Sequence, residues 1–202
     1  CQNGVDIHTV TASQVFGVRP VSVTPDMRKS AKAVNFGIVY GISAFSLSED
    51  IGVSVPEAKA YIESYLRNYE GVREYMKRIV EQAKRDGYVT TLLGRRRELP
   101  ELKSSNFNIR SFGERVALNT PIQGTAADII KIAMIRVDNA LRRKKLRARL
   151  ILQVHDELIV ECPLEEQQTV AELVKYEMEH VMQLHVPLLA EAKCGASWYE
   201  AK

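Results

Sequence analysis

The stretch that decides the fold is TPDMRKSAKAVNFGIVYG, which occupies residues 24–41. Thr24 offers a hydroxyl that can cap a helix, and Pro25 suits the first helical position, where its missing N–H group is not needed. A carboxylate in the first turn, near the positive end of the helix dipole, supports the same start. We therefore expect a helix that runs from about Pro25 to Tyr40 and stops at Gly41.

Four side chains of this helix form one ridge. They stand four residues apart, and on a helix of 3.6 residues per turn such positions drift by only about 40° at each step. The ridge carries two cations followed by two aromatic rings: Arg28, Lys32, Phe36 and Tyr40. Cations suit phosphates and aromatic faces suit a base, so the ridge predicts a nucleotide site. Spacing alone also allows an ordinary amphipathic helix with a solvated basic end and a buried aromatic end.

A second group of polar residues lies in QVHDEL, residues 153–158. Apolar runs over 150–155 and 158–162 flank the step from Asp156 to Glu157, which predicts a β-hairpin, although this pair is a poor choice for a tight turn. Carboxylates at a hairpin tip suit hard divalent cations, which take oxygen ligands. Such ions stabilise the attacking and leaving oxygens in phosphoryl transfer. The alternative is a solvated turn.

A third stretch, ERVALNTPIQGTAAD over residues 114–128, repeats the four-residue spacing. Arg115, Asn119 and Gln123 share one ridge of a helix. Their side chains can reach minor-groove acceptors of DNA, which are nearly the same for every base pair, so such contacts test the shape of a pair without reading sequence. The alternative is a polar helix surface.

In the order 24–41, 114–128 and 153–158, these stretches resemble motif B, the segment of the Q helix and motif C of the family A DNA polymerases. The first matches the pattern R-x-x-x-K-x-x-N-F-G-x-x-Y-G of the O helix, here residues 25–41. The resemblance implies that Arg28 and Lys32 hold the incoming triphosphate, with Lys32 also taking part in catalysis. It further implies that Phe36 stacks near the sugar and base, and a phenylalanine at this position goes with exclusion of dideoxynucleotides. Tyr40 is implied to lie by the templating base.

The resemblance also implies roles for the hairpin and the third stretch. Asp156 is implied to bind a catalytic metal ion, Glu157 to be an auxiliary acidic residue, and His155 to lie near the primer end. Two Mg²⁺ ions are the expected cofactors, and deoxynucleoside triphosphates and primer–template DNA are the expected partners. Further residues implied to contact DNA are Gln153, Arg115, Asn119 and Gln123.

The order of expected elements indicates an α+β fold. A helix-rich part comes first, and a helix, an antiparallel hairpin packed on helices, a further helix and a strand follow it. By resemblance, residues 1–113 form the fingers, which include the O helix, and residues 114–202 form the C-terminal half of the palm. The remaining expected elements are helices over 6–16, 54–69, 72–86, 109–145 (disturbed by Pro121 and Gly124) and 164–184, a first hairpin over 88–99, and a final strand over 189–194.

The chain departs from the family pattern at its start. The family's thumb, its first palm strands and motif A, which carries the other catalytic aspartate, have no counterpart here. Residues 6–12 resemble the segment that follows motif A, and we expect them to be structural. Asp128 and Glu161 are the carboxylates one can nominate as substitutes, and neither matches a family ligand. The sequence begins with Cys1 and not with an initiator Met, so we expect a fragment. A complete catalytic site is expected to need the missing N-terminal part of the polymerase.

Composition bounds the class of protein. Apolar residues make up 46% and charged residues 26% of the 202 residues, which is ordinary for a soluble globular protein. No apolar run approaches the roughly 20 residues of a membrane helix, so no membrane partner is expected. The basic cluster at 142–149 lies at an expected helix C-terminus, where cations complement the dipole. Three widely spaced cysteines predict a reduced, intracellular protein. The family resemblance implies a cytoplasmic location, with association with the bacterial nucleoid expected.

Two functional hypotheses follow. In the first, the chain is part of a working DNA-directed DNA polymerase of DNA replication or repair. In the second, it is a catalytically inactive module that binds a nucleotide or duplex DNA. A purely structural helical interaction domain leaves the three motifs unexplained.

Overall fold

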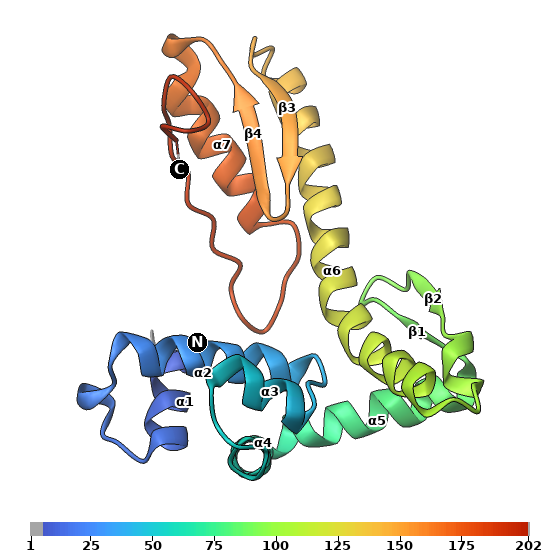
Figure 1. Cartoon of the computed structure of the whole chain (residues 1–202). Coiled ribbons are helices and arrows are strands. Elements are labelled where there is room, and N and C mark those ends of the chain that lie inside the picture. Colours follow the sequence, from blue (N-terminus) through green and yellow to red (C-terminus); the bar gives the residue numbers. More distant parts are fainter. Residues whose placement is uncertain (1–5, 202) are drawn as a thin grey trace. The chain divides into compact units, whose positions relative to one another are not determined.

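The computed structural model describes residues 6–201 of the chain. Helices dominate these residues, and their strands form two separate two-stranded antiparallel sheets (Figure 1). This confirms the predicted α+β class. The chain divides into two compact units, one up to Gly124 and one from Thr125 onward, so the division falls inside helix α6 (Phe107–Arg143). The boundary between fingers and palm at 113/114 stays a prediction.

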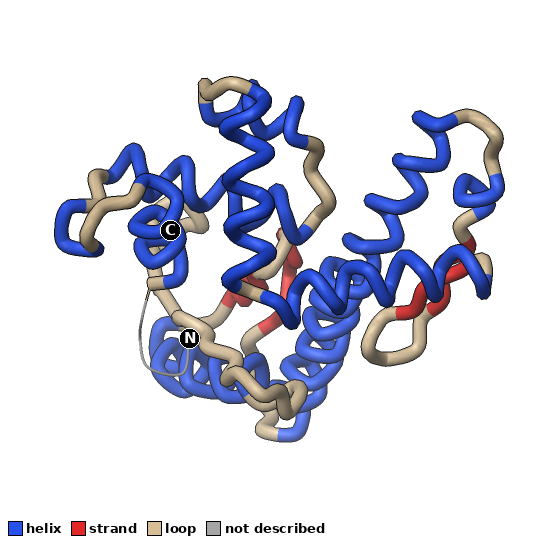
Figure 2. Tube along the Cα trace, turned by 90° about the horizontal axis from the view of Figure 1, so that it is seen from below, coloured by secondary structure: helices blue, strands red, loops and turns tan. Residues whose placement is uncertain are grey.

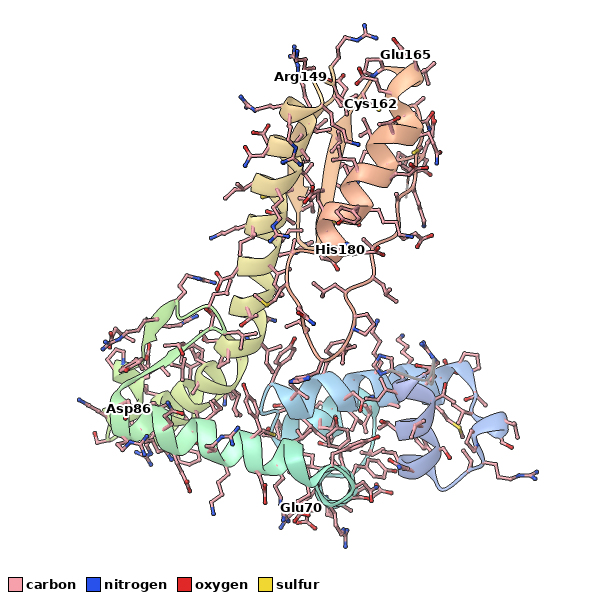
Figure 3. The ribbon with its side chains drawn as sticks, turned by 180° about the vertical axis from the view of Figure 1, so that it is seen from behind. Glu70, Asp86, Arg149, Cys162, Glu165 and His180 are labelled. Carbon is pink, nitrogen blue, oxygen red and sulfur yellow. The ribbon has the colours of Figure 1, made fainter. Side chains whose placement is uncertain are left out.

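The first unit opens on a series of helices joined by short connections. They are α1 (Ile7–Phe16), α2 (Pro25–Val39), α3 (Ala44–Ile51), α4 (Val55–Asn68) and α5 (Glu70–Asp86), and Figure 3 marks Glu70 and Asp86 at the two ends of α5. Their apolar faces bury a common core, which places α2 on α3 and α4 and leaves the polar face of α2 in solvent. The buried residues of that core are Val34, Ile38, Leu47, Ala58 and Tyr65.

Helix α2 starts and ends where its sequence predicts. Thr24 Oγ1 accepts a hydrogen bond from Met27 N at 3.2 Å. Tyr40 is the C-cap residue, and Gly41 follows with a φ of 75°, in the left-handed region. A Cβ at Gly41 would lie 2.9 Å from Leu118 Cδ1, so this position combines a backbone conformation and a close approach that both require glycine.

Helix α3 was not expected from the sequence. It spans only eight residues, too few for apolar periodicity to stand out. Ser43 nevertheless begins it as a helix-capping residue should, because its hydroxyl accepts a hydrogen bond from Ser46 N at 3.0 Å. The cap is the local feature that could have revealed the helix.

A first hairpin, β1 (Tyr88–Thr90) and β2 (Arg96–Glu98), follows α5 as expected. Its loop packs on α6, where Arg95 Nη2 donates a hydrogen bond to Gly124 O at 2.9 Å. A Cβ on Gly124 would lie 2.6 Å from Thr91 Cγ2, so the absence of a side chain there permits the contact.

Helix α6 runs through 37 residues with Pro121 inside it. The proline removes one backbone hydrogen bond, yet the helix continues past it, as the resumed periodicity predicted. None of the helices between residues 6 and 201, α6 included, is long and apolar enough to cross a membrane.

The second unit contains the end of α6, a hairpin of β3 (Arg149–Val154) and β4 (Glu157–Glu161), and helix α7 (Gln167–Glu179) (Figure 1). Figure 2 colours the helices of the chain blue and its strands red. Figure 3 marks Arg149 and Cys162 at the end of the hairpin away from its tip. The strands are antiparallel, with an irregular register between Leu150 and Leu152. Leu158 and Val160 of β4 pack on a core of Val137, Ala140, Leu141, Ala148, Val170 and Leu173.

Two expectations for the end of the chain are wrong. Helix α7 ends at Glu179 rather than near 184, and residues 189–194 do not form a strand. A short strand needs a partner for its backbone groups. Within residues 6–201, β3 and β4 pair with each other and with no third strand.

Candidate functional site

The predicted ridge is present on α2. The Lys32 Nζ atom lies 6.0 Å from the centroid of the Phe36 ring. The rings of Phe36 and Tyr40 stack, with centroids 6.3 Å apart and planes inclined by 27°. Arg28 and Lys32 are exposed, and Phe36 is 48% exposed. The half-exposed Phe36 ring argues against a merely buried aromatic end and leaves a face on which a base can stack.

Helix α1 brings further polar residues to this ridge. The His8 ring lies 5.9 Å from the Phe36 ring. His8 Nδ1 and Asn35 Nδ2 are 2.9 Å apart, and Thr11 Oγ1 donates a hydrogen bond to Asn35 Oδ1 at 2.9 Å. Thr11 and Asn35 are both buried. The sequence interpretation took residues 6–12 as structural, because spacing within one segment says nothing about partners in another.

Asp6 and Arg28 form an ion pair beside the ridge. Asp6 Oδ2 accepts hydrogen bonds at 2.6 Å from both Arg28 Nε and Thr9 Oγ1. These bonds, that from Arg28 first, hold the pKa of the Asp6 carboxyl well below its usual range. The same pairing raises the pKa of the Arg28 guanidinium. Both groups therefore stay charged at any physiological pH.

The ridge predicted on α6 is also present in the first unit. Asn119 Nδ2 donates a hydrogen bond to Gln123 Oε1 at 3.3 Å. Arg115 Nη1 donates to Ser111 Oγ at 3.2 Å, and its guanidinium lies 6.0 Å from the centroid of Phe112. These contacts are long and lie at the surface, so they cost little to exchange for contacts to another molecule.

The end of α2 and the helix α6 share a pocket. Its volume is about 390 Å³, within the range of about 300–1,000 Å³ that is usual for ligand sites. Tyr40 and Arg115, which come from two separate motifs, both line it. The full lining is Gly37, Tyr40, Ile42, Ser43, Ser46 and Arg115.

The carboxylate hairpin exists in the second unit, but its turn comes one residue earlier than expected. Val154 pairs with Glu157, so the loop consists of His155 and Asp156, and Glu157 belongs to β4. His155 has a φ of 52°, a left-handed conformation that costs a residue other than glycine roughly 1–2 kcal/mol. Gln153 Nε2 braces the turn by donating a hydrogen bond to His155 O at 2.6 Å. Both carboxylates are exposed.

The described residues do not complete a metal site at the hairpin. Between residues 6 and 201, no three His, Cys, Asp or Glu side chains gather in a way that could hold a metal ion. Of the two carboxylates nominated as substitutes, Asp128 is buried. Glu161 lies opposite Arg149 in the strand register, at the end of the hairpin far from Asp156. The exposed oxygens of Asp156 fit a hard divalent cation as one ligand among several.

Several basic residues of the first hairpin and of the cluster at 142–149 contact other groups of the protein. In the first hairpin, Arg96 lies 3.6 Å from the Tyr88 ring centroid and pairs with Glu98 at 2.6 Å, whereas Arg97 is exposed. Near the end of α6, the arginines have acidic partners, which agrees with a structural role for this cluster. The pairs are Arg142 with Asp138, Arg143 with Glu177, and Arg147 with Glu165 and Glu166.

Comparison with known proteins identifies the class to which this fold and these motifs belong. A model of DNA polymerase family A matches residues 1–200, and the chain belongs to that family. It is 57% identical over 200 residues to DNA polymerase I of Bacillus subtilis (strain 168), which covers 99% of this chain and 23% of that protein. With DNA polymerase I of Streptococcus pneumoniae (strain ATCC BAA-255 / R6) the identity is 54% over 202 residues, again 23% of the relative.

A solved structure is also similar. It is the POL domain of Pol1 from M. smegmatis in complex with DNA primer-template and dNTP, with a TM-score of 0.92 and 47% identity. The match covers 98% of this chain and 35% of that one. These findings confirm the family resemblance that the three motifs indicated, and the chain spans less than a quarter of the length of the curated relatives.

Proposed function

We propose that this chain supplies the fingers and the C-terminal half of the palm of a DNA-directed DNA polymerase. The observation that carries the proposal is the α2 ridge, where exposed cations lead to the half-exposed Phe36 ring and to Tyr40, which lines a pocket. Cations for a triphosphate and a stacking face for a base are the two ends of one ligand. The relatedness to bacterial DNA polymerase I and the M. smegmatis complex supports the same function.

In this proposal the ridge binds the incoming deoxynucleoside triphosphate. Arg28 and Lys32 donate charge-assisted hydrogen bonds to the phosphates, and Phe36 stacks near the sugar and base. Tyr40, which lines the pocket, lies by the templating base. Arg115, Asn119 and Gln123 contact the minor groove of the primer–template duplex and test the shape of the newest pair.

The hairpin tip serves the reaction itself. Asp156 supplies one oxygen ligand for a divalent cation, Glu157 assists as a second acidic group, and His155 and Gln153 lie near the primer end. When bound, divalent ions (two Mg²⁺ in the complete site) stabilise the attacking and leaving oxygens. The primer 3′-hydroxyl oxygen forms a bond to the α-phosphorus, its proton leaves to water, and the bond to the β-phosphate breaks with release of pyrophosphate.

The second candidate is a catalytically inactive module that binds a nucleotide or duplex DNA. One observation favours it for the chain alone: no group of three metal-ligating side chains exists within residues 6–201. Under the first proposal, an N-terminal part of the polymerase brings the other catalytic aspartate to Asp156. The setting proposed for the whole enzyme is the bacterial cytoplasm at the nucleoid, in DNA replication and repair.

Primer extension separates the two candidates. The 202-residue chain and its Asp156→Ala form are each given a short primer–template, magnesium and four deoxynucleotides, with and without the N-terminal part of the polymerase. We expect extension only when the N-terminal part is present and Asp156 is intact. Extension by the chain alone that vanishes on Asp156→Ala would mean that a substitute carboxylate completes the site. No extension by any mixture, with nucleotide still bound, would favour the inactive module.

Phe36→Tyr is expected to relax exclusion of dideoxynucleotides. The added hydroxyl can donate a hydrogen bond to the triphosphate in place of the one lost with the 3′-hydroxyl of the nucleotide. A hydrogen bond to a charged group contributes about 1.5–3 kcal/mol, so relative dideoxynucleotide incorporation should rise by about 10- to 100-fold. Competition between ddNTP and dNTP measures this, with Phe107→Tyr on another exposed ring as the control. Unchanged selectivity in Phe36→Tyr would remove the role assigned to Phe36.

A further inference from the structure

The first turn of helix α1 holds the side chain of Asp6 in place. Asp6 is the N-cap residue, and its Oδ1 accepts a hydrogen bond from His8 N at 3.1 Å. Its Oδ2 accepts one from Thr9 Oγ1 at 2.6 Å. Both donors belong to the first turn of the helix, so the place of the carboxylate is set by local backbone geometry rather than by a long, mobile side chain.

The same carboxylate holds Arg28 by one particular nitrogen. Arg28 Nε donates to Asp6 Oδ2 at 2.6 Å, and the side chains are 49% and 38% exposed. A guanidinium is a rigid planar fork, so a bond at Nε orients the whole group. It leaves the two Nη atoms for a ligand, in the arrangement that matches two oxygens of a phosphate.

Helices α1 and α2 are joined tightly enough to carry this pair together. Ala12 of α1 and Ala31 of α2 are fully buried. Between the helices, the buried Thr11 hydroxyl donates to Asn35 Oδ1 at 2.9 Å. A buried polar bond of this kind is costly to break, so a movement of α2 takes α1 with it. Asp6 and Arg28 therefore lie on two helices that this buried contact joins.

We infer that Asp6 is a positioning residue for nucleotide binding, which holds the Arg28 guanidinium ready to receive the triphosphate. The inference rests on the proposed function, because it requires that Arg28 bind the phosphates. When a long side chain is already ordered before the ligand arrives, binding does not lose the conformational entropy of that side chain. The Asp6 carboxylate also repels the negatively charged phosphates. Water and salt screen this repulsion, which acts over a longer distance, more than they screen the direct 2.6 Å contact of Asp6 with Arg28.

Two substitutions separate the orienting role of Asp6 from its capping role. Asparagine and serine are both good N-cap residues, so Asp6→Asn and Asp6→Ser keep α1 intact. Asparagine leaves a neutral acceptor for Arg28 Nε, and serine is too short to reach it. In the polymerase that contains this chain, the KM for dNTP should rise by about 2- to 12-fold, more for serine than for asparagine. The kcat should change far less.

Two controls accompany the kinetics. Glu70→Gln removes another exposed ion pair of the same unit, Arg73 Nη2 to Glu70 Oε1 at 3.0 Å, and should leave the KM unchanged. Arg28→Ala should raise the KM, and adding Asp6→Asn to it should raise the KM no further, because the partner is already gone. Thermal unfolding shows whether each variant is folded, and if Asp6→Asn is not, Asp6→Ser decides.

The outcomes are distinct. A KM that rises on Asp6→Asn or Asp6→Ser, and not when Arg28 is already Ala, supports the inference. An unchanged or lower KM in both folded Asp6 variants, while Arg28→Ala raises it, overturns the inference and leaves the proposed function standing. If Arg28→Ala itself leaves the KM unchanged, the proposed triphosphate contact is the part that fails.

Discussion

Asp156→Ala is expected to lower the kcat of primer extension by about 1,000-fold in the polymerase that contains this chain. The substitution removes an exposed carboxylate from the tip of the β3–β4 hairpin, so little packing is lost and the fold should remain. If Asp156 is a metal ligand, as proposed, its loss falls on charge stabilisation in the transition state. Such a ligand supports that stabilisation by several kcal/mol, and about 4 kcal/mol corresponds to about 1,000-fold. The KM for dNTP should change far less.

Asp138→Ala is the matched control for this change. Asp138 is likewise an aspartate of the second unit, and its carboxylate pairs with Arg142 at 2.9 Å on the surface of α6. Its substitution should leave extension close to that of the unmodified enzyme, since exposed i,i+4 pairs contribute only about 0.3–0.5 kcal/mol. Near-normal extension by Asp156→Ala would show that the hairpin carboxylate is not a catalytic ligand.

Lys32→Ala is expected to raise the KM for dNTP by about 10- to 100-fold. Lys32 is exposed on the α2 ridge, one helical turn from Arg28 and 6.0 Å from the Phe36 ring centroid. Its ammonium is proposed to donate to the triphosphate, and such a charged hydrogen bond contributes about 1.5–3 kcal/mol. Steady-state extension with increasing dNTP measures the change, and a smaller fall in kcat would reflect the part of Lys32 in catalysis.

Lys29→Ala tests whether position matters more than charge. Lys29 is exposed on the same helix and carries the same charge, but it does not lie on the ridge. Its removal should change the KM far less than that of Lys32. Equal effects of the two substitutions would mean that the helix attracts the triphosphate through its total charge, and the specific contact would be lost from the mechanism.

The parts of the fold that sequence predicted well are those that local chemistry determines. Thr24 and Gly41 mark the limits of α2, and the four-residue spacing of its ridge follows from helical geometry alone. The hairpin followed from two apolar runs, but its turn shifted to His155 and Asp156. That shift was not predictable because it requires a left-handed His155, which turn preferences disfavour and Gln153 braces.

What escaped prediction depends on contacts between distant segments. The ion pair of Asp6 with Arg28 and the buried bond of Thr11 with Asn35 connect two helices, and no periodicity within either helix points to the other. The prediction of a strand over 189–194 was wrong because it considered this segment alone and not whether another strand lies beside it. Its apolar residues suit a strand, but a strand exists only beside a partner. The candidate site was accordingly found through its motifs, and its supporting contacts were found only in three dimensions.

The contact between the first hairpin and α6 constrains the order in which the chain can vary over generations. Alanine at Gly124 meets the Thr91 methyl group, so this change alone is disfavoured. Serine at Thr91 removes that methyl group and keeps the hydroxyl oxygen that accepts a hydrogen bond from Arg95 N at 3.1 Å. Thr91→Ser followed by Gly124→Ala therefore avoids the steric clash, whereas the reverse order passes through a strained variant with alanine at position 124 and threonine at position 91. The close approach therefore couples the two positions, because the alanine is accommodated better once the serine is present.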